Sequence, residues 1–268
     1  MYTIKMFFVI PSLSRVDTLI KKSLSLLLYH YKIPAKQIHI FVVAEEADLY
    51  RVRLLEISPH IHLHIGPLGL HHMRNFIHTT FPEGVEMICM DDDITDLKSM
   101  TIQEEIVDVK SSKRYPLTSL SAEAFQLFLT DAFQELRKQH LTLFGIYPVR
   151  NGYFMKDLPE KTYNLRFIVG CIWGCINRHD ILIHLEEKED VERTILYFIK
   201  DKGVLRYNRI CPVTNYYKEP GGMQRNDILS RKEASQESCM YLINTFPTYC
   251  KLYTSKKSGI HEIRFING

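Results

Sequence analysis

The first ninety residues alternate between short apolar runs and segments whose apolar residues have helical spacing, and this alternation constrains the fold most strongly. The apolar runs, which predict strands, are residues 5–10, 38–43, 61–65 and 85–90. The segments with helical spacing are residues 19–31, 48–56 and 70–81. Strands and helices that alternate through short connections form a mostly parallel sheet with helices on both faces. We therefore expect an α/β fold with a Rossmann-like central sheet.

A polar cluster follows each of these four predicted strands. The clusters are Pro11 to Arg15, Glu45-Glu46, Gly66 to Gly69, and Asp91 to Asp93. Ligands of open α/β sheets bind in the crevice beyond the carboxyl ends of the strands. The four clusters therefore predict one ligand site along that edge of the sheet.

The second half of the chain is less regular. We expect helices over 121–139, 190–200 and 227–246, strands over 143–147, 165–169 and 204–207, and a polar surface excursion over 98–117. Ser14 or Asp17 is expected to cap the first helix of the chain. Because no repeat, low-complexity tract or linker interrupts residues 1–268, we expect a single domain.

Composition excludes several classes of protein. An apolar fraction of 46% and a charged fraction of 24% exclude wholesale disorder and a fibrous repeat. A net charge of +3 neither indicates nor excludes a nucleic-acid partner. The apolar N-terminus predicts a strand rather than a signal peptide, and no apolar run is long enough for a transmembrane helix. The six cysteines are expected to be reduced and buried, in a soluble intracellular protein.

The triple aspartate Asp91-Asp92-Asp93 is the most specific feature of the chain. Adjacent carboxylates repel one another, so a cation is expected to offset their charge. In an extended backbone Asp91 and Asp93 point to one side and Asp92 to the other. Asp91 and Asp93 are therefore candidate ligands of one divalent metal with oxygen ligands. The alternative is a solvated acidic turn or a helix cap.

Arg74 and Asn75 lie in the helix that opens after Gly69. A guanidinium matches the geometry of phosphate, and the start of a helix offers unpaired N–H groups to an anion. A glycine turn is followed by an arginine, and acidic residues come after the next strand. This order favours a phosphate-binding role for Gly69, Arg74 and Asn75. The alternative is a solvated arginine on the helix surface.

Two further positions at strand ends are candidate contacts to a nucleotide base or ribose. One is the segment from Pro11 and Ser12 to Arg15, which offers main-chain, hydroxyl and guanidinium groups. The other is Glu45, whose carboxylate can accept hydrogen bonds, although Glu46 beside it is an equal candidate. An incidental Arg15 in a loop is the alternative.

The pair Glu189-Asp190 stands at the start of a predicted helix, where carboxylates are favoured by the helix dipole. Either residue is also a candidate general base for an acceptor hydroxyl. The sequence leaves capping and catalysis equally open.

The segment from Gly170 to Asn177 contains the only tryptophan, Trp173, and two glycines. Small residues beside an aromatic ring suit the close approach of a sugar or base, and tight core packing is the alternative. Cys171 and Cys175 lack the partner pair that a zinc site needs. His71 and His72 are the histidines closest to the predicted ligand edge.

Taken together, these motifs resemble the GT-A glycosyltransferases, and most closely the TET/JBP-associated glycosyltransferases of phages, large DNA viruses and some protists. The resemblance covers most of residues 5–225. It rests on Ile10-Pro11-Ser12 with Arg15, Arg74-Asn75-Phe76-Ile77, Asp91-Asp92-Asp93-Ile94, Gly170 through Asn177, Lys188-Glu189-Asp190, Arg206-Tyr207-Asn208 and Pro220-Gly221-Gly222.

The resemblance implies transfer of a sugar from a nucleotide-sugar, expected to be a UDP-hexose such as UDP-glucose, to a 5-hydroxymethylated pyrimidine in DNA. Residues 1–97 would bind the donor and residues 98–268 the acceptor. Asp91 and Asp93 would hold Mn²⁺ or Mg²⁺, and Asp190 or Glu189 would be the acceptor base. The donor would contact Pro11, Ser12, Arg15, Glu45, Gly69, Arg74, Asn75, Asp91 and Asp92.

The expectations for acceptor binding by residues 98–268 are less specific. Trp173, Tyr216 or Tyr217 could stack on an extruded base. A modest basic bias near the end of the chain is compatible with phosphate contacts and comprises Arg225, Arg231, Lys232, Lys251, Lys256, Lys257 and Arg264. The alternatives are a GT-A transferase that acts on a glycan or protein, and a non-catalytic module that binds nucleotide-sugars.

Overall fold

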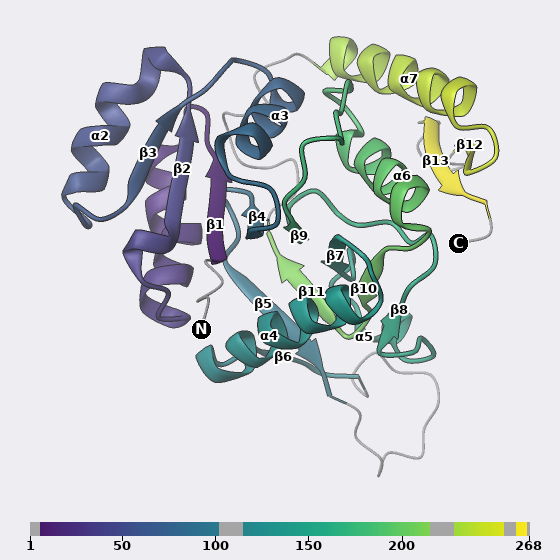
Figure 1. Ribbon diagram of the computed structural model, residues 1–268, viewed down its shortest axis with the longest axis horizontal. Helices are drawn as coiled ribbons and strands as arrows, with labels where there is room; N and C mark the ends of the chain where they lie inside the picture. Colours follow the sequence, from purple (N-terminus) through teal and green to yellow (C-terminus); the bar gives the residue numbers. More distant parts are fainter. Residues whose placement is uncertain (1–5, 102–114, 215–227, 255–260, 267–268) are drawn as a thin grey trace.

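An eight-stranded sheet runs through the computed structural model, which describes residues 6–101, 115–214, 228–254 and 261–266 (Figure 1). Its strands, in the order β3-β2-β1-β4-β9-β7-β10-β8, come from both halves of the chain. They are β1 (Met6–Pro11), β2 (Ile38–Val42), β3 (His62–Ile65), β4 (Glu86–Met90), β7 (Leu143–Ile146), β8 (Lys161–Thr162), β9 (Ile172–Ile176) and β10 (Leu205–Tyr207).

Strands β3, β2, β1 and β4 pair in parallel, as the sequence predicts. β9 then runs antiparallel between β4 and β7, so β7 returns to the direction of β4. β10 is parallel to β7, and β8 closes the edge in the opposite direction. The expectation of a mostly parallel central sheet is therefore confirmed, and the carboxyl ends of six strands meet at one edge.

Helices cover both faces of the sheet (Figure 1). The first helical segment, over residues 16–30, begins as α1 (Val16–Leu19) and continues as two π-helical stretches (Ile20–Leu24 and Leu26–His30). The other helices are α2 (Ala47–Leu55), α3 (Leu70–Thr80), α4 (Ala122–Lys138), α5 (Gly152–Met155), α6 (Glu189–Asp201) and α7 (Ile228–Thr245). Short 3₁₀ turns at Ala35–Gln37 and Ala44–Glu46 flank β2. Ser121 caps α4 by accepting a hydrogen bond from the Ala124 N–H.

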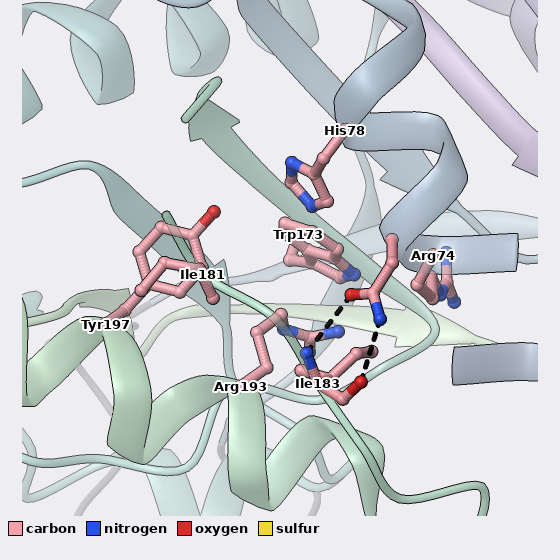
Figure 2. Close-up of a pocket in the computed structure, with 8 residues that line it drawn as sticks. Arg74, His78, Trp173, Ile181, Ile183, Arg193 and Tyr197 are labelled. Atoms are coloured by element: carbon pink, nitrogen blue, oxygen red, sulfur yellow. Dashed lines mark hydrogen bonds between the residues drawn. The ribbon is translucent and has the colours of Figure 1, made fainter. Parts of the chain in front are cut away.

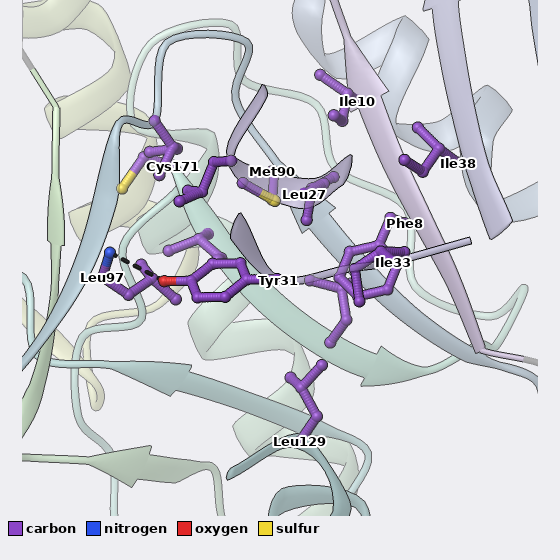
Figure 3. Packing of buried hydrophobic residues seen from close by; sticks show 14 of the residues in the cluster. Phe8, Ile10, Leu27, Tyr31, Ile33, Ile38, Met90, Leu97, Leu129 and Cys171 are labelled. Atoms are coloured by element: carbon purple, nitrogen blue, oxygen red, sulfur yellow. Dashed lines mark hydrogen bonds between the residues drawn. The ribbon is translucent and has the colours of Figure 1, made fainter. Parts of the chain in front are cut away.

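Alternate side chains of β1 enter two different hydrophobic cores. Phe8 and Ile10 pack in the core beneath the 16–30 helix and α4 (Figure 3). In the same core Tyr31 stacks on Phe125. Val9 faces the opposite core, which α3 and α6 cover. The period of two along a strand thus places a core on each face of the sheet.

The small-residue segment forms the central strand β9 instead of a ligand wall. Trp173 is 1% exposed, so our expectation that it stacks on an extruded base is wrong. A Cβ atom on Gly174 would lie 2.2 Å from Cε1 of Phe144, which shows that the glycine permits close packing of two strands. The core-packing alternative is correct. Tyr216, Tyr217 and the Pro220-Gly222 motif lie outside the described residues.

Two further predictions of local structure are wrong. Residues 165–169 form no strand, because side chains of α6 take their main-chain groups: Thr194 accepts from the Ile168 N–H and Arg193 donates to the Ile168 carbonyl. Of the predicted polar excursion over 98–117, residues 98–100 and 117 belong instead to a second, three-stranded sheet, and residues 102–114 lie outside the described residues. Its strands, in the order β11-β5-β6, are β5 (Asp96–Met100), β6 (Leu117–Ser119) and β11 (Ile210–Val213).

The chain ends in α7 and an antiparallel hairpin of β12 (Cys250–Thr254) and β13 (His261–Phe265). All six cysteines are buried and none forms a disulfide. Among the described helices, none combines the length and the apolarity that crossing a bilayer requires.

Three histidines lie side by side on β2 and β3. His39 is 7% exposed, its ring stacks on His62, and its Nδ1 lies 2.8 Å from Nε2 of His64. Burial, together with the proximity of His62 and His64, lowers the pKa of His39 to about 3. The folded protein therefore holds His39 neutral.

We predict that His39→Phe makes the protein less sensitive to acid. A histidine with a lowered pKa binds fewer protons when folded than when unfolded, so its contribution to stability is lost as the pH falls below about 6.5. His39 accounts for about 2 kcal/mol of the loss between pH 7 and pH 5. Urea unfolding at both pH values should show this loss reduced in His39→Phe and unchanged in His60→Phe, an exposed control. Equal losses in both variants would contradict the prediction.

Candidate active site

The ends of β1 and β4 are tied together by Asp92. One carboxylate oxygen accepts from the Ser12 hydroxyl at 2.7 Å, and the other pairs with Nη1 of Arg15 at 3.2 Å. The Tyr50 hydroxyl completes the link, because it lies 2.8 Å from the Ser12 hydroxyl and accepts from the Arg15 N–H. Asp92 is 4% exposed, and burial raises its pKa to about 6 despite these partners. Its carboxylate therefore positions Ser12 and Arg15.

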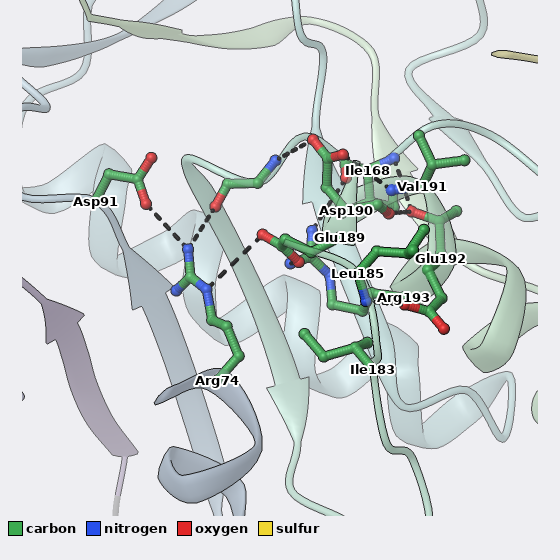
Figure 4. A network of polar contacts seen from close by, with 12 residues as sticks. Arg74, Asp91, Ile168, Ile183, Leu185, Glu189, Asp190, Val191, Glu192 and Arg193 are labelled. Atoms are coloured by element: carbon green, nitrogen blue, oxygen red, sulfur yellow. Dashed lines mark hydrogen bonds and ion pairs between the residues drawn. The ribbon is translucent and has the colours of Figure 1, made fainter. Parts of the chain in front are cut away.

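Asp91 points to the other side of the turn, toward α3. Its Oδ1 accepts from Nη2 of Arg74 at 3.0 Å, while 39% of the aspartate side chain is exposed (Figure 4). Withdrawal from water raises the pKa of Asp91 to about 7; Arg74 opposes this rise, and the nearby Asp93 and Asp92 add to it. Asp91 is thus the accessible member of the triple aspartate and lies where a further cation is favourable.

Asp93 is 8% exposed, and its side chain forms no hydrogen bond or ion pair within the part of the chain that the structure describes. No helix follows it, since β5 begins at Asp96, so the capping alternative is wrong. Among the described residues no three His, Cys, Asp or Glu side chains are grouped as a complete metal site. One or two carboxylates with open positions suit Mg²⁺, which takes its other ligands from waters and substrate phosphates.

Arg74 joins the triple aspartate to the start of α6. The arginine is 2% exposed, and its Nη2 also donates to the Gly170 carbonyl, just before β9, at 3.3 Å. Its Nε lies 3.8 Å from Oε1 of Glu189, whose other oxygen pairs with Arg193 at 2.9 Å (Figure 4). Glu189 is 5% exposed and held between two guanidinium groups. This arrangement suits a positioning role better than contact with an acceptor.

Asp190 stands beside Glu189 with its carboxylate oriented by the main chain. Its two oxygens accept from the N–H groups of Gly170 at 3.1 Å and Val191 at 2.9 Å. Burial, with repulsion from Glu189, raises the pKa of Asp190 to about 6, against the opposing effect of Arg193 and these two hydrogen bonds. The structure therefore brings the predicted acid pair to the same edge as the triple aspartate.

Asn75 and Gly69 have structural roles that the sequence did not reveal. The Asn75 amide donates to the Ile183 carbonyl at 2.8 Å and accepts from the Ile183 N–H at 3.1 Å. The Asn75 amide links the segment before α6 to α3, and its contact with a nucleotide-sugar donor stays a prediction. Gly69 has a φ of +102°, and a Cβ there would lie 2.5 Å from Oε1 of Glu186.

Glu186 occupies the start of α3, where we expected free N–H groups to await a phosphate. Its carboxylate accepts from the Leu70 N–H at 2.7 Å and lies 2.7 Å from Nδ1 of His71. The chain itself therefore supplies the anion at this helix start. No local signal marks Glu186, which is 116 residues from Leu70.

At the ends of β1 and β2, the structure distinguishes the two glutamates. Glu46 accepts from the Ser14 N–H at 2.7 Å and from its hydroxyl at 2.5 Å. Ser14 is therefore engaged with Glu46, and neither Ser14 nor Asp17 caps the first helix. Glu45 is exposed and makes no side-chain bond to the described residues, so it is accessible to a ligand. Pro11 ends β1 beside this loop.

Comparison with known proteins places the fold. No family model and no curated protein sequence matches the chain. It is similar to the mannosyltransferase PcManGT from Pyrobaculum calidifontis, solved with GDP-Man and Mn²⁺, with a TM-score of 0.55 and 11% identity over 92% of this chain and 65% of that chain. It is also similar to S. aureus TarS, solved with UDP-GlcNAc, with a TM-score of 0.54 and 13% identity over 90% of this chain and 67% of that chain.

The chain thus spans about two thirds of the length of both structures. Identities this low establish the fold alone, and the fold is that of the GT-A nucleotide-sugar transferases. The closer likeness to the TET/JBP-associated group stays a prediction.

We predict that Gly69→Ala destabilises the protein more than Gly84→Ala. Both glycines have positive φ, which costs an alanine about 1–3 kcal/mol. Only at Gly69 must the added Cβ also displace a neighbour, Glu186, since nothing lies within 4 Å of it at Gly84. Urea unfolding should show an additional loss of about 1 kcal/mol, the value of a hydrogen bond. In a Glu186→Ala background this excess should fall, leaving only the closer approach to Cδ2 of His72; an unchanged excess would refute the assignment.

Proposed function

We propose that the protein is a metal-dependent glycosyltransferase that uses a nucleotide-sugar donor. The observation that carries the proposal is the pair Asp91 and Asp93 at the end of β4 in a GT-A sheet. One of these carboxylates is accessible and the other has no partner among the described residues. The solved GT-A structures with GDP-Man and Mn²⁺ or with UDP-GlcNAc support the same class of ligand.

Asp93 and the unpaired Oδ2 of Asp91 would hold Mn²⁺ or Mg²⁺. The ion, when bound, neutralises charge that develops on the leaving diphosphate. Arg74 would keep Asp91 in position, and Arg15, which Asp92 orients, would face the donor. Glu45 is the accessible candidate for contact with the base or ribose, and the main chain around Pro11, Ser12 and Gly69 lines the donor edge. Residues 1–97 would thus supply most of the donor contacts.

Asp190 is the acceptor base in this proposal. Two main-chain N–H groups orient its carboxylate, and with a pKa of about 6 it is deprotonated at neutral pH and able to take a proton from a hydroxyl. Glu189 would position Asp190 and Arg74 from its place between two arginines. A base on the acceptor side fits direct, inverting displacement of the diphosphate.

We expect the donor to stabilise the protein only when the metal is present. A ligand that binds the folded state alone, at 100 times its dissociation constant, stabilises that state by about 2.7 kcal/mol. Thermal unfolding with UDP-glucose, UDP-GlcNAc or GDP-mannose should show a rise in Tm that requires Mn²⁺ and disappears in Asp93→Asn. Asp48→Asn, on the outer helix α2, is the control. A donor effect that survives both EDTA and Asp93→Asn would exclude this metal site.

Asp190→Asn should strongly slow transfer but leave donor binding intact. Loss of a general base typically slows a reaction by about 100-fold or more. Release of nucleoside diphosphate in the presence of an acceptor should fall by that factor, while the donor-induced rise in Tm persists. Glu189→Gln should weaken both, because it also loosens Arg74. Unchanged turnover in Asp190→Asn would assign the base elsewhere. Donor binding without hydrolysis or transfer in the wild type would support a non-catalytic nucleotide-sugar module.

For the acceptor, we propose a 5-hydroxymethylated pyrimidine in DNA. Lys251 and Arg264 are exposed and lie directly opposite each other across the β12–β13 hairpin. Like charges in this position are unfavourable unless an anionic partner offsets them. The same face carries Glu262, which pairs with Lys188 next to the acid pair of α6. An anionic acceptor on the hairpin would therefore lie beside the segment that leads into Asp190.

The remaining basic residues of the sequence do not bear on this proposal. Arg225, Lys256 and Lys257 lie outside the described residues, and the side chains of Arg231 and Lys232 are likewise not described.

A panel of acceptors tests the assignment. Hydroxymethylated DNA, unmodified DNA, glycans and peptides would be offered with each donor and examined by mass spectrometry. Transfer to hydroxymethylated DNA, reduced in Lys251→Ala with Arg264→Ala, supports it. Transfer to a glycan or peptide alone would replace it with the alternative GT-A activity.

A further inference from the structure

Three arginines of the described residues are less than a tenth exposed, and one of them has no carboxylate partner. Figure 2 shows two of the three, Arg74 on α3 and Arg193 on α6. Both pair with Glu189, and Arg74 also pairs with Asp91. The third, Arg206 on β10, is 7% exposed and pairs with no Asp or Glu of the described residues. Arg206 is therefore a buried cation whose charge this part of the chain does not balance.

The contacts of Arg206 are all with neutral groups. Its Nε donates to Oδ1 of Asn208 at 2.7 Å, and its Nη1 donates to the Phe167 carbonyl at 3.4 Å. The guanidinium lies 5.3 Å from the centre of the Tyr147 ring. Nη2 makes no hydrogen bond to the described residues and is open to solvent. Withdrawing a guanidinium from water without a charged partner is costly, so the free Nη2 favours an anionic ligand.

A second arginine adds to this excess of positive charge. Arg166, in the segment before β9, likewise pairs with no carboxylate of the described residues, and its Nε is buried without a hydrogen-bond partner. Burial, with the positive charge of Arg166, lowers the pKa of Arg206 to about 10, and Tyr147 opposes this effect. Both arginines remain charged at neutral pH. Like charges near each other are unfavourable unless an anion offsets them.

The two arginines lie close to the proposed acceptor base. Phe167, which accepts from Arg206, is three residues before Gly170, whose N–H donates to Asp190. Because consecutive Cα atoms are 3.8 Å apart, the Cα atoms of Phe167 and Gly170 lie at most about 11 Å apart. Phe167 also packs in the core that α6 shares with α7 and the hairpin, together with Ile263. This segment therefore runs between the basic hairpin and Asp190.

The direction of the Arg206 guanidinium is fixed by a buried asparagine. Asn208 is 0% exposed, and its amide nitrogen donates to the Pro159 carbonyl at 2.9 Å and to the Thr162 hydroxyl at 3.3 Å. These two bonds leave the amide oxygen to accept from Nε of Arg206. A charged group that is already held in position loses little conformational freedom when it binds a ligand.

We propose that Arg206, with Arg166 near it, binds a backbone phosphate of the acceptor close to the nucleotide whose hydroxyl faces Asp190. The inference rests on the proposed function, because it takes the acceptor to be DNA. A guanidinium suits this ligand, since its N–H groups match the geometry of phosphate oxygens and it carries a fixed positive charge. In the competing interpretation, Arg206 only ties β10 to the main chain at Phe167.

Binding of a hydroxymethylated single-stranded oligonucleotide, measured by fluorescence anisotropy without donor, separates the two interpretations. Arg206→Gln should weaken binding about tenfold or more, the value of a hydrogen bond to a charged group. The slope of log Kd against log salt concentration should decrease by about 0.7 for one lost phosphate contact. A purely structural arginine would lower the Tm and leave this slope unchanged.

Two further variants make this measurement decisive. Arg166→Gln alters a less buried side chain and should shift the affinity and the slope in the same direction, even if Arg206→Gln does not fold. Arg51→Gln, on the outer helix α2 and paired with Asp48, should change neither. An affinity and a slope that stay at the wild-type values in both Arg206→Gln and Arg166→Gln would overturn the proposal.

Removing the charge from the ligand gives the reciprocal test. An oligonucleotide with neutral methylphosphonate linkages on both sides of the hydroxymethylated nucleotide should bind the wild type about tenfold more weakly than the natural backbone. Arg206→Gln should bind both oligonucleotides equally, because the contact is already lost. The same tenfold difference in Arg206→Gln would show that other residues hold these phosphates and would overturn the proposal.

Inorganic phosphate separates failure of this inference from failure of the proposed function. If DNA is neither bound nor modified, phosphate should still raise the Tm of the wild type relative to chloride at equal ionic strength. The rise should be reduced in Arg206→Gln and kept in Asp93→Asn, which alters the donor site. That result would retain the phosphate site and replace DNA with another phosphate-bearing acceptor. No rise with phosphate, or an equal rise in Arg206→Gln, would overturn the proposal.

Discussion

The buried guanidinium of Arg74 holds together three segments that are far apart in the chain. It binds Asp91 at the end of β4, the Gly170 carbonyl before β9, and Glu189 at the start of α6. Removing a guanidinium from water costs several kcal/mol, which only close and well-directed partners offset. Loss of one partner from such a buried network typically costs about 3–5 kcal/mol. The relative positions of Asp91 and Asp190, the carboxylates proposed to bind the metal and to accept the proton, therefore depend on this one side chain.

The antiparallel insertion of β9 explains why these segments meet. β9 extends the pairing with β4 beyond the last strand residue, since the Asp91 N–H donates to the Cys171 carbonyl at 2.8 Å. Gly170 is thereby fixed opposite the triple aspartate. Its lack of a side chain leaves room for the acids of α6, because a Cβ atom at this position would lie only 3.1 Å from Oε1 of Glu189. A single reversed strand thus brings the second half of the chain to the ligand edge that the first half builds.

The sequence predicted those features of the structure that depend on residues close together in the chain. The strands and helices of the first ninety residues, the edge at which Asp91 to Asp93 lie, and the opposite directions of Asp91 and Asp92 all follow from periodicity and strand geometry. Asn75, Glu186 and residues 165–169 could not be predicted in the same way. Asn75 bonds to Ile183, 108 residues away, and main-chain groups near Ile168 bond to side chains of α6. Such partners are chosen by tertiary packing, which leaves no periodic pattern in the sequence.

Two residues with strained backbone lie close to the candidate site around Asp91 to Asp93. Five described residues other than glycine have positive φ, and three of them, Lys32, His140 and Lys202, follow the last turn of a helix, where a left-handed residue is common. The other two are Ser14, beside Arg15, and Lys188, which starts α6 just before Glu189 and Asp190. Such conformations persist only where surrounding contacts enforce them, and they concentrate at functional sites. Ser14 is held by Glu46 and Lys188 by Glu262, so each strained residue is fixed by a carboxylate from another part of the chain. The two unusual backbone positions thus lie beside Arg15 and beside the acid pair, on the two sides of the triple aspartate that are proposed to bind the donor and the acceptor.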